Sequence, residues 1–326
     1  MKAIVISRPG GPEVLELRDV ETPRPGPGEV RVRVRAAGVN RADLLQRMGA
    51  YPAPPDAPSD IPGLELAGEI DEVGPHVRDL AVGDRVFGLC GGGAYAEALV
   101  AHSRALARLP QEVDFTAGAA VPEAFVTAWD ALVSQAGLSA GETVLIHAAG
   151  SGVGTAAVQL ARAIGARAIG TSRTAAKLER ARGLGLEAGL IVEGGRFAAQ
   201  VKQAVGEVDV VLELVGGGYL AEDLACLAPR GRIVLVGLMA GARAELDLAT
   251  LLRKRARVFG TVLRSRPLEE KIAATRDFER HVVPLLTRGA LAPIVDRVFP
   301  LARAAEAHAY VASNQGFGKV VLEIGA

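Results

Sequence analysis

The sequence predicts an α/β protein that combines a doubly wound parallel sheet with a mainly β, partly closed barrel. Three observations predict this fold class. Residues 1–110 hold short β-rich runs separated by glycine and proline, as in small barrels. From residue 143 onward, strand and helix patterns alternate, which is typical of a parallel sheet covered by helices. Where the alternation begins, TVLIHAAGSGVG at 143–154 joins an apolar strand to a helix through small residues.

The first region is expected to contain six short strands, because β-rich runs alternate there with turn residues. These runs are 3–6, 15–20, 29–37, 66–73, 85–89 and 95–100. A short helix is expected over 41–48. The segment 51–62 holds five prolines and is expected to be a surface loop.

The second region begins with two expected helices, 115–120 and 123–136, and continues as strand–helix units. The expected strands are 143–147, 167–171, 189–192, 208–212, 232–236 and 257–262, and the helices are 152–164, 174–184, 196–205, 219–227, 248–254 and 268–287. A helix over 302–313 and a strand over 319–324 no longer follow the βα pattern, so this tail is expected to return to the first domain. We therefore expect one domain over 1–120 completed by 292–326, and a nucleotide domain over 121–291.

The turn at 148–154 predicts a binding site for a pyrophosphate. Ser151, Gly152, Val153 and Gly154 are small and open a helix whose N-terminal amides and dipole attract anions. The glycines at 150, 152 and 154 depart from the usual G-x-G-x-x-G spacing. A glycine-rich turn that binds nothing is therefore the alternative.

The end of the second strand favours NADPH over NADH. Ser172, Arg173 and Lys177 stand where an acidic residue would otherwise bind the free 2′-hydroxyl of NAD. Hydroxyl and basic groups favour a 2′-phosphate. The alternative is that the two cations are ordinary solvated surface charges. Gly237 and Leu238 end a later parallel strand, where ligands of such sheets collect.

Composition excludes several classes of function. The chain has 326 residues and equal numbers of basic and acidic side chains, 37 each, which argues against nucleic acid or an anionic membrane as the main partner. No apolar run approaches the ~18–20 residues of a membrane helix, and the N-terminus has no signal-peptide pattern, so we expect a cytoplasmic protein. Cys90, Cys226 and His147 are expected to be buried core residues rather than metal ligands.

Six stretches together resemble the zinc-independent branch of the medium-chain dehydrogenase/reductase superfamily. Within it, the chain resembles the quinone oxidoreductase (zeta-crystallin-like) family, most of all its tumour-suppressor-inducible type. The stretches are GVNRAD at 38–43, IPGLELAG at 61–68, VPEA at 121–124 with Thr127-Ala128, His147-Ala148 with SGVG at 151–154, LRSR at 263–266 and GKVVL at 318–322. The resemblance implies a GroES-like catalytic domain, a Rossmann nucleotide domain and a homodimer formed on its sheet edge, with a tetramer also open. It also implies NADPH-dependent reduction of a quinone-like small molecule.

Zinc is not expected, because the ligand positions have changed. Zinc-dependent relatives place cysteine and histidine where this chain has Asn40 and Leu64, and only Glu65 remains. Three protein ligands are needed for a catalytic zinc. An electron-poor quinone can accept a hydride without a Lewis acid, provided that the protein binds and orients it.

The resemblance also implies the remaining site residues. Asn40 and Tyr51 are the expected catalytic residues, with Asn40 facing the nicotinamide and Tyr51 stacking on or donating to the quinone. Further cofactor contacts are expected from Thr127, Leu263, Ser265, Phe317 and Lys319. The alternatives are structural: Asn40 as a helix N-cap, Tyr51 in loop packing, and Thr127 bonded to its own helix. Val192 replaces a tyrosine of the resembling type near the adenine, which is expected to weaken adenine packing.

Two other functions remain open. One is an NADPH-dependent reductase of enones or enoyl thioesters, which uses the same hydride donor with a different acceptor. The other is a nucleotide-binding structural or regulatory protein without turnover. The presence of both the nucleotide turn and the polar residues Asn40, Tyr51 and Thr127 favours an enzyme over an inert scaffold.

Overall fold

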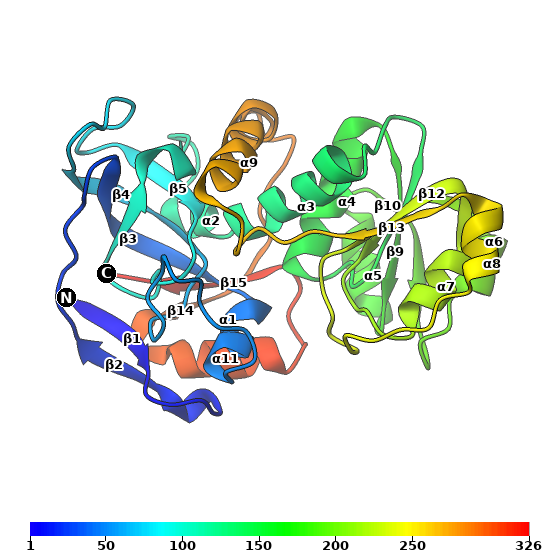
Figure 1. The fold of residues 1–326 in the computed structure, drawn as a ribbon, viewed down its shortest axis with the longest axis horizontal. Coiled ribbons are helices and arrows are strands. Elements are labelled where there is room, and N and C mark those ends of the chain that lie inside the picture. Colours follow the sequence, from blue (N-terminus) through cyan, green and yellow to red (C-terminus); the bar gives the residue numbers. More distant parts are fainter. Residues whose placement is uncertain (326) are drawn as a thin grey trace. The chain divides into compact units, whose positions relative to one another are not determined.

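The computed structural model describes residues 1–325, which group into two compact units. Unit 1 comprises Met1–Val126 together with the chain from Leu263 onward, and unit 2 comprises Thr127–Val262. No helix in the described chain has the length and apolar character needed to cross a membrane. The predicted α/β fold class is confirmed: unit 1 is mainly β and unit 2 is an α/β unit with a parallel sheet (Figure 1).

Unit 1 is built on a seven-stranded sheet and a two-stranded ribbon. The sheet order is β14-β15-β3-β4-β5-β7, with β6 also paired to β3, and β1 pairs with β2. The strands are β1 (Lys2–Ile6), β2 (Leu15–Asp19), β3 (Glu29–Val39), β4 (Glu65–Val73), β5 (Arg85–Leu89), β6 (Ala98–His102), β7 (Leu106–Arg108), β14 (Val295–Pro300) and β15 (Lys319–Glu323). The C-terminal strand β15 pairs antiparallel with β3, so the tail returns to the first sheet as predicted.

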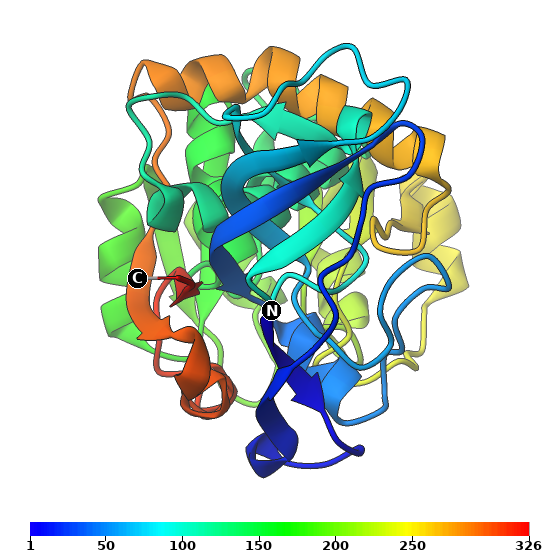
Figure 2. The same ribbon diagram turned by 90° about the vertical axis from the view of Figure 1, so that its left-hand side faces the viewer.

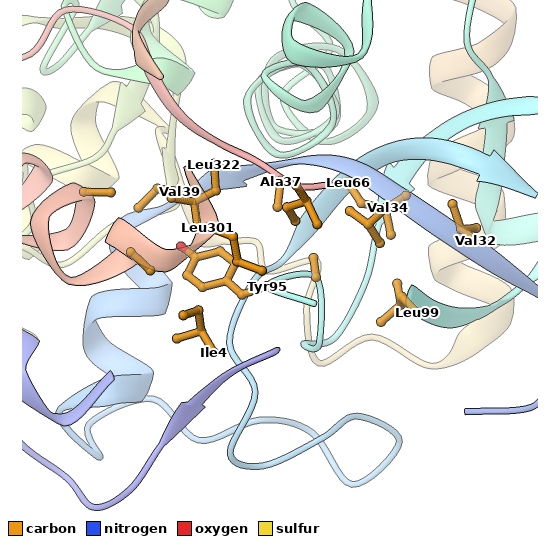
Figure 3. Packing of buried hydrophobic residues seen from close by; sticks show 14 of the residues in the cluster. Ile4, Val32, Val34, Ala37, Val39, Leu66, Tyr95, Leu99, Leu301 and Leu322 are labelled. Carbon is orange, nitrogen blue, oxygen red and sulfur yellow. The ribbon is translucent and has the colours of Figure 1, made fainter. Parts of the chain in front are cut away.

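The helices of unit 1 cover this sheet and its edges. They are α1 (Arg41–Arg47), α2 (Phe115–Ala119), α9 (Leu268–His281), α10 (Val283–Thr287) and α11 (Ala304–Ala312), with single turns η1 (Pro12–Val14), η2 (Ser103–Ala105), η3 (Pro122–Val126) and η5 (Leu301–Arg303). The alternation of valines with polar residues in β3 gives the sheet one apolar face. Figure 3 shows the result: Tyr95 lies among the aliphatic side chains of Ile4, Val39 and Leu301.

Unit 2 is a six-stranded, fully parallel sheet in the order β10-β9-β8-β11-β12-β13. Its strands are β8 (Thr143–Ile146), β9 (Arg167–Ser172), β10 (Leu186–Ile191), β11 (Val208–Glu213), β12 (Leu227–Leu235) and β13 (Arg257–Gly260). Its helical segments are α3 (Thr127–Trp129), η4 (Asp130–Gln135), α4 (Gly152–Ile164), α5 (Ala175–Arg182), α6 (Ala198–Val205), α7 (Tyr219–Cys226) and α8 (Leu248–Lys254). Helix α4 packs on one face, whereas α6 and α8 cover the other (Figure 1).

Three features differ from the sequence-based expectation. The expected helix 268–287 is interrupted at Val282, because Pro284 has no amide to continue the helical hydrogen bonds. The short strands β7 and β14 were not predicted. Finally, 263–291 groups with unit 1 rather than with unit 2, because α9 packs on β7 and η2 and its Phe278 contacts Phe87 of β5, with ring centroids 5.6 Å apart. Figure 2 shows α9 in orange along that part of unit 1.

Candidate functional site

The turn after β8 leads into the N-terminus of α4 in unit 2. Ser151 is the N-cap of α4, and its hydroxyl accepts a hydrogen bond from the amide of Gly154 at 3.0 Å. The amides of Gly152 and Val153 have no hydrogen-bond partner within the described part of the chain. Free amides at a helix N-terminus, together with the helix dipole, suit an anion such as phosphate. The four predicted turn residues therefore lie together at an anion-compatible position.

Two glycines allow the backbone to approach closely around this turn. A Cβ atom on Gly154 would lie 2.4 Å from the carbonyl oxygen of Ala148, and one on Gly237 would lie 2.5 Å from that of Leu214. Both distances are far inside van der Waals contact, so any side chain there would push the backbone apart. Gly154 thus keeps α4 against the turn after β8, and Gly237 keeps the segment after β12 against the end of β11.

This turn lies at the point where the strand order of the sheet reverses. β8 lies between β9 and β11, and the chain proceeds outward from β8 in one direction and from β11 in the other. Ligands of doubly wound sheets bind at the carboxyl ends of the strands beside such a switch point. Gly237 and Leu238 follow the carboxyl end of β12 at this edge, and the side chain of Leu238 is 54% exposed.

The residues predicted to select NADPH follow β9 at the same edge. Ser172 ends β9, and its hydroxyl accepts a hydrogen bond from the amide of Thr174 at 3.2 Å. Arg173 is exposed, and Lys177 is half-buried in the first turn of α5. The sequence has no carboxylate between 171 and 178. The end of β9 therefore offers a hydroxyl group and two cations.

Two further predicted positions lie in the interior of unit 2. Thr127 begins α3, is 7% exposed, and belongs to a helical segment that packs against α4. Val192 is buried and packs in the core cluster that contains Phe197. Its effect on adenine packing stays a prediction.

His147, which follows β8, is buried as predicted, but it has polar partners that the sequence did not indicate. Its Nδ1 lies 2.8 Å from the hydroxyl of Thr171, and its Nε2 lies 2.7 Å from Oδ1 of Asp223. Oε2 of Glu213 is 3.8 Å from the same Nε2. All three ionisable side chains are fully buried.

Protons, rather than cations, neutralise this buried cluster. Burial lowers the pKa of His147 to about 4, and it raises the pKa of Glu213 to about 8 and that of Asp223 to about 7. Oε2 of Glu213 and Oδ2 of Asp223 have no hydrogen-bond partner in the described chain. A proton retained by one carboxyl can be donated to the other, which satisfies both oxygens. The histidine is therefore neutral, and the two carboxyls hold a proton at neutral pH.

The same three side chains bring potential metal-ligand atoms within 4.8 Å of one another. Two ligands held ~2.0–2.2 Å from one tetrahedral zinc ion lie about 3.4 Å apart. The 2.7 Å between His147 Nε2 and Asp223 Oδ1 is instead the length of a hydrogen bond. The geometry therefore fits a hydrogen-bonded cluster better than a metal centre.

In unit 1, Asn40 connects β3 to α1 and is the N-cap residue of that helix. Its Nδ2 donates to Oε1 of Glu65 at 2.8 Å, and its Oδ1 accepts from the ammonium group of Lys319. Lys319 also pairs with Oε1 of Glu65 at 2.5 Å, and both of these charged side chains are almost fully buried. Asn40 and Lys319, predicted separately as cofactor contacts, are thus bonded to each other and to a carboxylate.

Tyr51 lies beside Arg264, a residue that was not predicted as part of the site. The guanidinium carbon is 5.0 Å from the centroid of the Tyr51 ring, and one guanidinium nitrogen donates to the Tyr51 carbonyl at 3.3 Å. Arg264 also donates to the carbonyl of Gly91 at 2.8 Å and to the side chain of Gln46. Burial raises the pKa of the Tyr51 phenol, so it stays protonated at neutral pH.

Two more carboxyls near Asn40 have raised pKa values. Burial raises the pKa of Asp43 to about 6. The hydrogen bonds that its carboxylate accepts from the Asn40 amide at 2.8 Å and the Tyr95 hydroxyl at 3.0 Å lower the pKa, but by less than burial raises it. Burial, followed by the charge of Glu65, raises the pKa of Glu123 to about 7. The backbone amide of Glu123 donates to Oε2 of Glu65 at 2.8 Å, so Glu123 lies beside the carboxylate that binds Asn40 and Lys319.

The other predicted positions differ in exposure. Ser265 is exposed, Leu263 is half-buried, and Phe317 is buried in unit 1. Cys226 is buried as predicted, whereas Cys90 is only half-buried and its thiol donates to a backbone carbonyl. Burial raises the pKa of both thiols to about 12, so neither is a reactive thiolate.

Several charged residues that lie beside the predicted positions were not expected from the sequence. Arg264, Asp43, Glu123, Glu213 and Asp223 each lie next to predicted residues in the fold but were not singled out as functional. The available signal was a charged residue within an apolar run, as in the segments around Glu123 and Glu213. Such a signal marks a buried charge but does not identify its partner.

Comparisons with known proteins agree with this architecture. Two family models match the chain: an alcohol dehydrogenase GroES-like domain over residues 26–111 and a zinc-binding dehydrogenase over residues 152–282. The quinone oxidoreductase of Sus scrofa is 36% identical over 333 residues, which cover 99% of this chain and 97% of that protein. The spectinabilin polyketide synthase system protein NorB of Streptomyces orinoci is 39% identical over 296 residues, which cover 89% of this chain and 13% of that protein. A solved mycobacterial protein complexed with NADPH is 31% identical, with a TM-score of 0.87 and coverage of 99% of this chain and 100% of that one.

Proposed function

Because this chain belongs to the quinone oxidoreductase family of the medium-chain dehydrogenase/reductase superfamily and is an oxidoreductase, we propose that it uses NADPH to reduce quinones without zinc. The observation that carries this proposal is the pair of unpartnered amides at the start of α4, beside the switch point of a parallel sheet. A pyrophosphate would accept hydrogen bonds from the amides of Gly152 and Val153. The close backbone contacts at Gly154 and Gly237 would let the nucleotide approach the sheet.

Selectivity for NADPH is supported by the residues after β9. Ser172, Arg173 and Lys177 would bind a 2′-phosphate through one hydroxyl and two cations. A solved neighbour that is complexed with NADPH agrees with this choice.

The residues of unit 1 do not fit a catalytic zinc. Asn40 and Leu64 occupy the positions at which zinc-dependent relatives carry ligands, and neither is an ordinary zinc ligand. Glu65 uses both of its carboxylate oxygens on Asn40, Lys319 and the amide of Glu123. The ammonium group of Lys319 would also repel a divalent cation at this position.

NADPH, when bound, supplies the hydride. The neutral phenol of Tyr51 would donate a hydrogen bond to a quinone oxygen, and Arg264 fixes the tyrosine ring from beside it. The remaining N–H of Asn40 is a second donor. Glu123, whose pKa lies near neutrality, can hold the proton that a reduced quinone must gain. Together these groups bind, orient and protonate an acceptor without a metal.

A specific observation favours a second candidate, the reduction of enones or enoyl thioesters. The chain is 39% identical to a segment of a polyketide synthase system protein. The same donors would bind the carbonyl oxygen of an unsaturated thioester. A nucleotide-binding protein without turnover remains the third function that the assay below distinguishes.

We also propose that the chain forms a homodimer through the open edge of β13, although a tetramer remains an alternative. β13 is the last strand of its sheet; Leu248 and Leu252 of the preceding helix α8 and Val262 after β13 are 65%, 77% and 48% exposed. An unpaired edge flanked by apolar side chains is suited to a second copy of the same sheet. Sedimentation velocity is expected to show a dimer, and an exclusively monomeric protein would contradict this assignment.

The assay is NADPH oxidation with 1,4-benzoquinone, 9,10-phenanthrenequinone, an enone and a crotonyl thioester, with NADH in parallel. Turnover with quinones and preference for NADPH are expected. Activity only on the thioester supports the second candidate, and no turnover with measurable nucleotide binding supports the third. Ser172→Ala with Lys177→Ala is expected to raise the KM for NADPH about tenfold, because two phosphate contacts are lost. Arg182→Ala, which alters a cation paired with Glu179 at the other end of α5, is the matched control.

A further inference from the structure

The side-chain amide of Asn40 is held at both ends by opposite charges. Its oxygen faces the ammonium group of Lys319, and its nitrogen donates to Oε1 of Glu65 at 2.8 Å. An amide has nearly the same shape when its oxygen and nitrogen are exchanged, so packing alone does not choose between the two orientations. Here the exchanged orientation would turn the NH₂ group toward an ammonium and the oxygen toward a carboxylate.

The two charged residues are themselves fixed. Lys319 donates to the carbonyl of Val39 at 3.3 Å and pairs with Oε1 of Glu65 at 2.5 Å. Oε2 of Glu65 accepts the amide of Glu123 at 2.8 Å. A Cβ atom on Gly38 would lie 2.1 Å from Oε1 of Glu65, so the carboxylate is pressed against the backbone of β3. Both charged side chains are almost fully buried and bonded to other groups, which holds them in place against a rotation of Asn40.

One N–H of Asn40 is left over after these bonds. An amide nitrogen carries two hydrogens, and Glu65 accepts only one of them. The backbone of Asn40 is also held, because its amide donates to Oδ2 of Asp43 at 2.8 Å. The remaining N–H is thus a donor of fixed direction on a residue that was predicted to contact the reacting groups.

We propose that Glu65 and Lys319 are positioning residues, which orient Asn40 so that its remaining N–H donates to the acceptor oxygen that gains negative charge during reduction. This inference rests on the proposed function, because it assigns Asn40 to the reaction. A donor that is already aligned stabilises the developing charge without reorganising during the step. Loss of the alignment therefore lowers kcat and leaves the binding of the nucleotide unchanged.

The test is a double-substitution cycle with Glu65→Gln and Asn40→Ala. Glutamine keeps the shape of Glu65 but presents either its NH₂ group or its neutral oxygen to Asn40. The Asn40 amide can then form a hydrogen bond in either of its two orientations. Glu65→Gln is expected to lower kcat with 9,10-phenanthrenequinone about tenfold, with the KM for NADPH changed less than about twofold. In the Asn40→Ala background, the same substitution is expected to change kcat less than about twofold, because the residue through which it acts is gone. An equal loss in both backgrounds overturns the proposal.

A buried cation elsewhere in unit 1 is the matched control. Arg47 is 4% exposed and donates to the carbonyl of Gly10 at 3.0 Å, with no bond to Asn40. If Arg47→Met reproduces the fall in kcat at unchanged KM, the effect is one of general stability and the proposal is wrong. Lys319→Arg keeps the positive charge, and it is expected to retain more activity than Lys319→Gln.

A second measurement does not require turnover. In ¹⁵N-labelled protein, the Asn40 side-chain amide, assigned through Asn40→Ala, is expected to show one strongly shifted proton, from the hydrogen bond to the carboxylate. That shift is expected to disappear in Glu65→Gln. A wild type that shows this signal but reduces no acceptor contradicts the proposed function, whereas an Asn40 signal insensitive to Glu65→Gln contradicts the positioning inference itself.

Discussion

The two units each bury a cluster of ionisable side chains, but they neutralise the charge differently. In unit 1, the ammonium of Lys319 lies 2.5 Å from the carboxylate of Glu65. In unit 2, no lysine or arginine in the described chain pairs with Glu213 or Asp223, and the neighbouring His147 is neutral because burial lowers its pKa. The proton retained by Glu213 and Asp223 is lost when the pH rises, because the raised pKa values of both carboxyls lie near neutrality. The second cluster is therefore sensitive to pH, whereas in the first the ammonium of Lys319 holds the carboxylate of Glu65 in a direct ion pair.

The largest expected effect comes from breaking the ion pair of unit 1. Lys319→Met leaves Glu65 buried without its cation, which is expected to lower the free energy of unfolding by about 3–5 kcal/mol. Adding Glu65→Gln removes the orphaned charge and is expected to restore part of this loss. Chemical denaturation of both variants measures the difference. If the double variant is less stable than Lys319→Met, the carboxylate is not the source of the penalty.

The next effect concerns Glu213 and Asp223, the two buried carboxyls of unit 2 that retain a proton at neutral pH. The pKa values of Glu213 and Asp223 are raised in the folded state, so the folded protein binds more protons than the unfolded chain between about pH 5 and 8. Its stability therefore falls as the pH rises through this range.

Asp223→Asn removes one of the two titrating groups and keeps a side chain of the same shape that can hydrogen-bond to Nε2 of His147. As the pH rises from 5 to 8, the free energy of unfolding of this variant is expected to increase, relative to that of the wild type, by on the order of 3 kcal/mol. Unfolding curves at several pH values measure the slope. Parallel pH profiles for the variant and the wild type would show that this carboxyl does not titrate in the folded state.

A smaller effect is expected from the buried hydroxyl that supports Asp43 in unit 1. Tyr95→Phe keeps the ring and removes the hydrogen bond to Asp43, which is expected to cost about 1–2 kcal/mol. Tyr310→Phe is the matched control. The Tyr310 hydroxyl donates to Asp296 at 2.7 Å in a more exposed setting, so its removal is expected to lower the free energy of unfolding by less. Equal losses would argue that burial does not decide the strength of these bonds.

The smallest effect is expected at the start of α4. Ser151→Ala removes the N-cap bond to the amide of Gly154 and is expected to cost about 1 kcal/mol of stability. A thermal shift of a few degrees would measure it. A change several times larger would show that Ser151 supports more of unit 2 than one helix end.

Local sequence patterns were sufficient for most of the fold. Apolar spacing and the glycine turn predicted α4 with the observed bounds, because its N-cap, its small first-turn residues and Gly165 at its end are local features. Strand β14 was missed because its apolar and charged residues do not alternate cleanly. Residues 263–291 were assigned to the other domain because a helix after a strand continues a βα pattern in sequence, and only packing against β7 decides otherwise.

The candidate site divides in the same way. The residues predicted at 151–154 and 172–177 follow from turn chemistry and from the position of a strand end, which are local features of the sequence, and their role in binding a nucleotide stays a prediction. Arg264 beside Tyr51, and Asp223 beside His147, join residues separated by many positions, and no local pattern specifies such pairs.

The amino-acid order by itself determined the fold class and the anion-compatible turn, because both depend on residue type or short-range spacing. Only the tertiary structure decided which charges are neutralised by a cation and which by a proton. Lys319 reaches Glu65 across β3, whereas no lysine or arginine of the described chain pairs with Glu213. Those outcomes depend on which strands are neighbours, and strand pairing is a long-range property that the order of residues along the chain does not display.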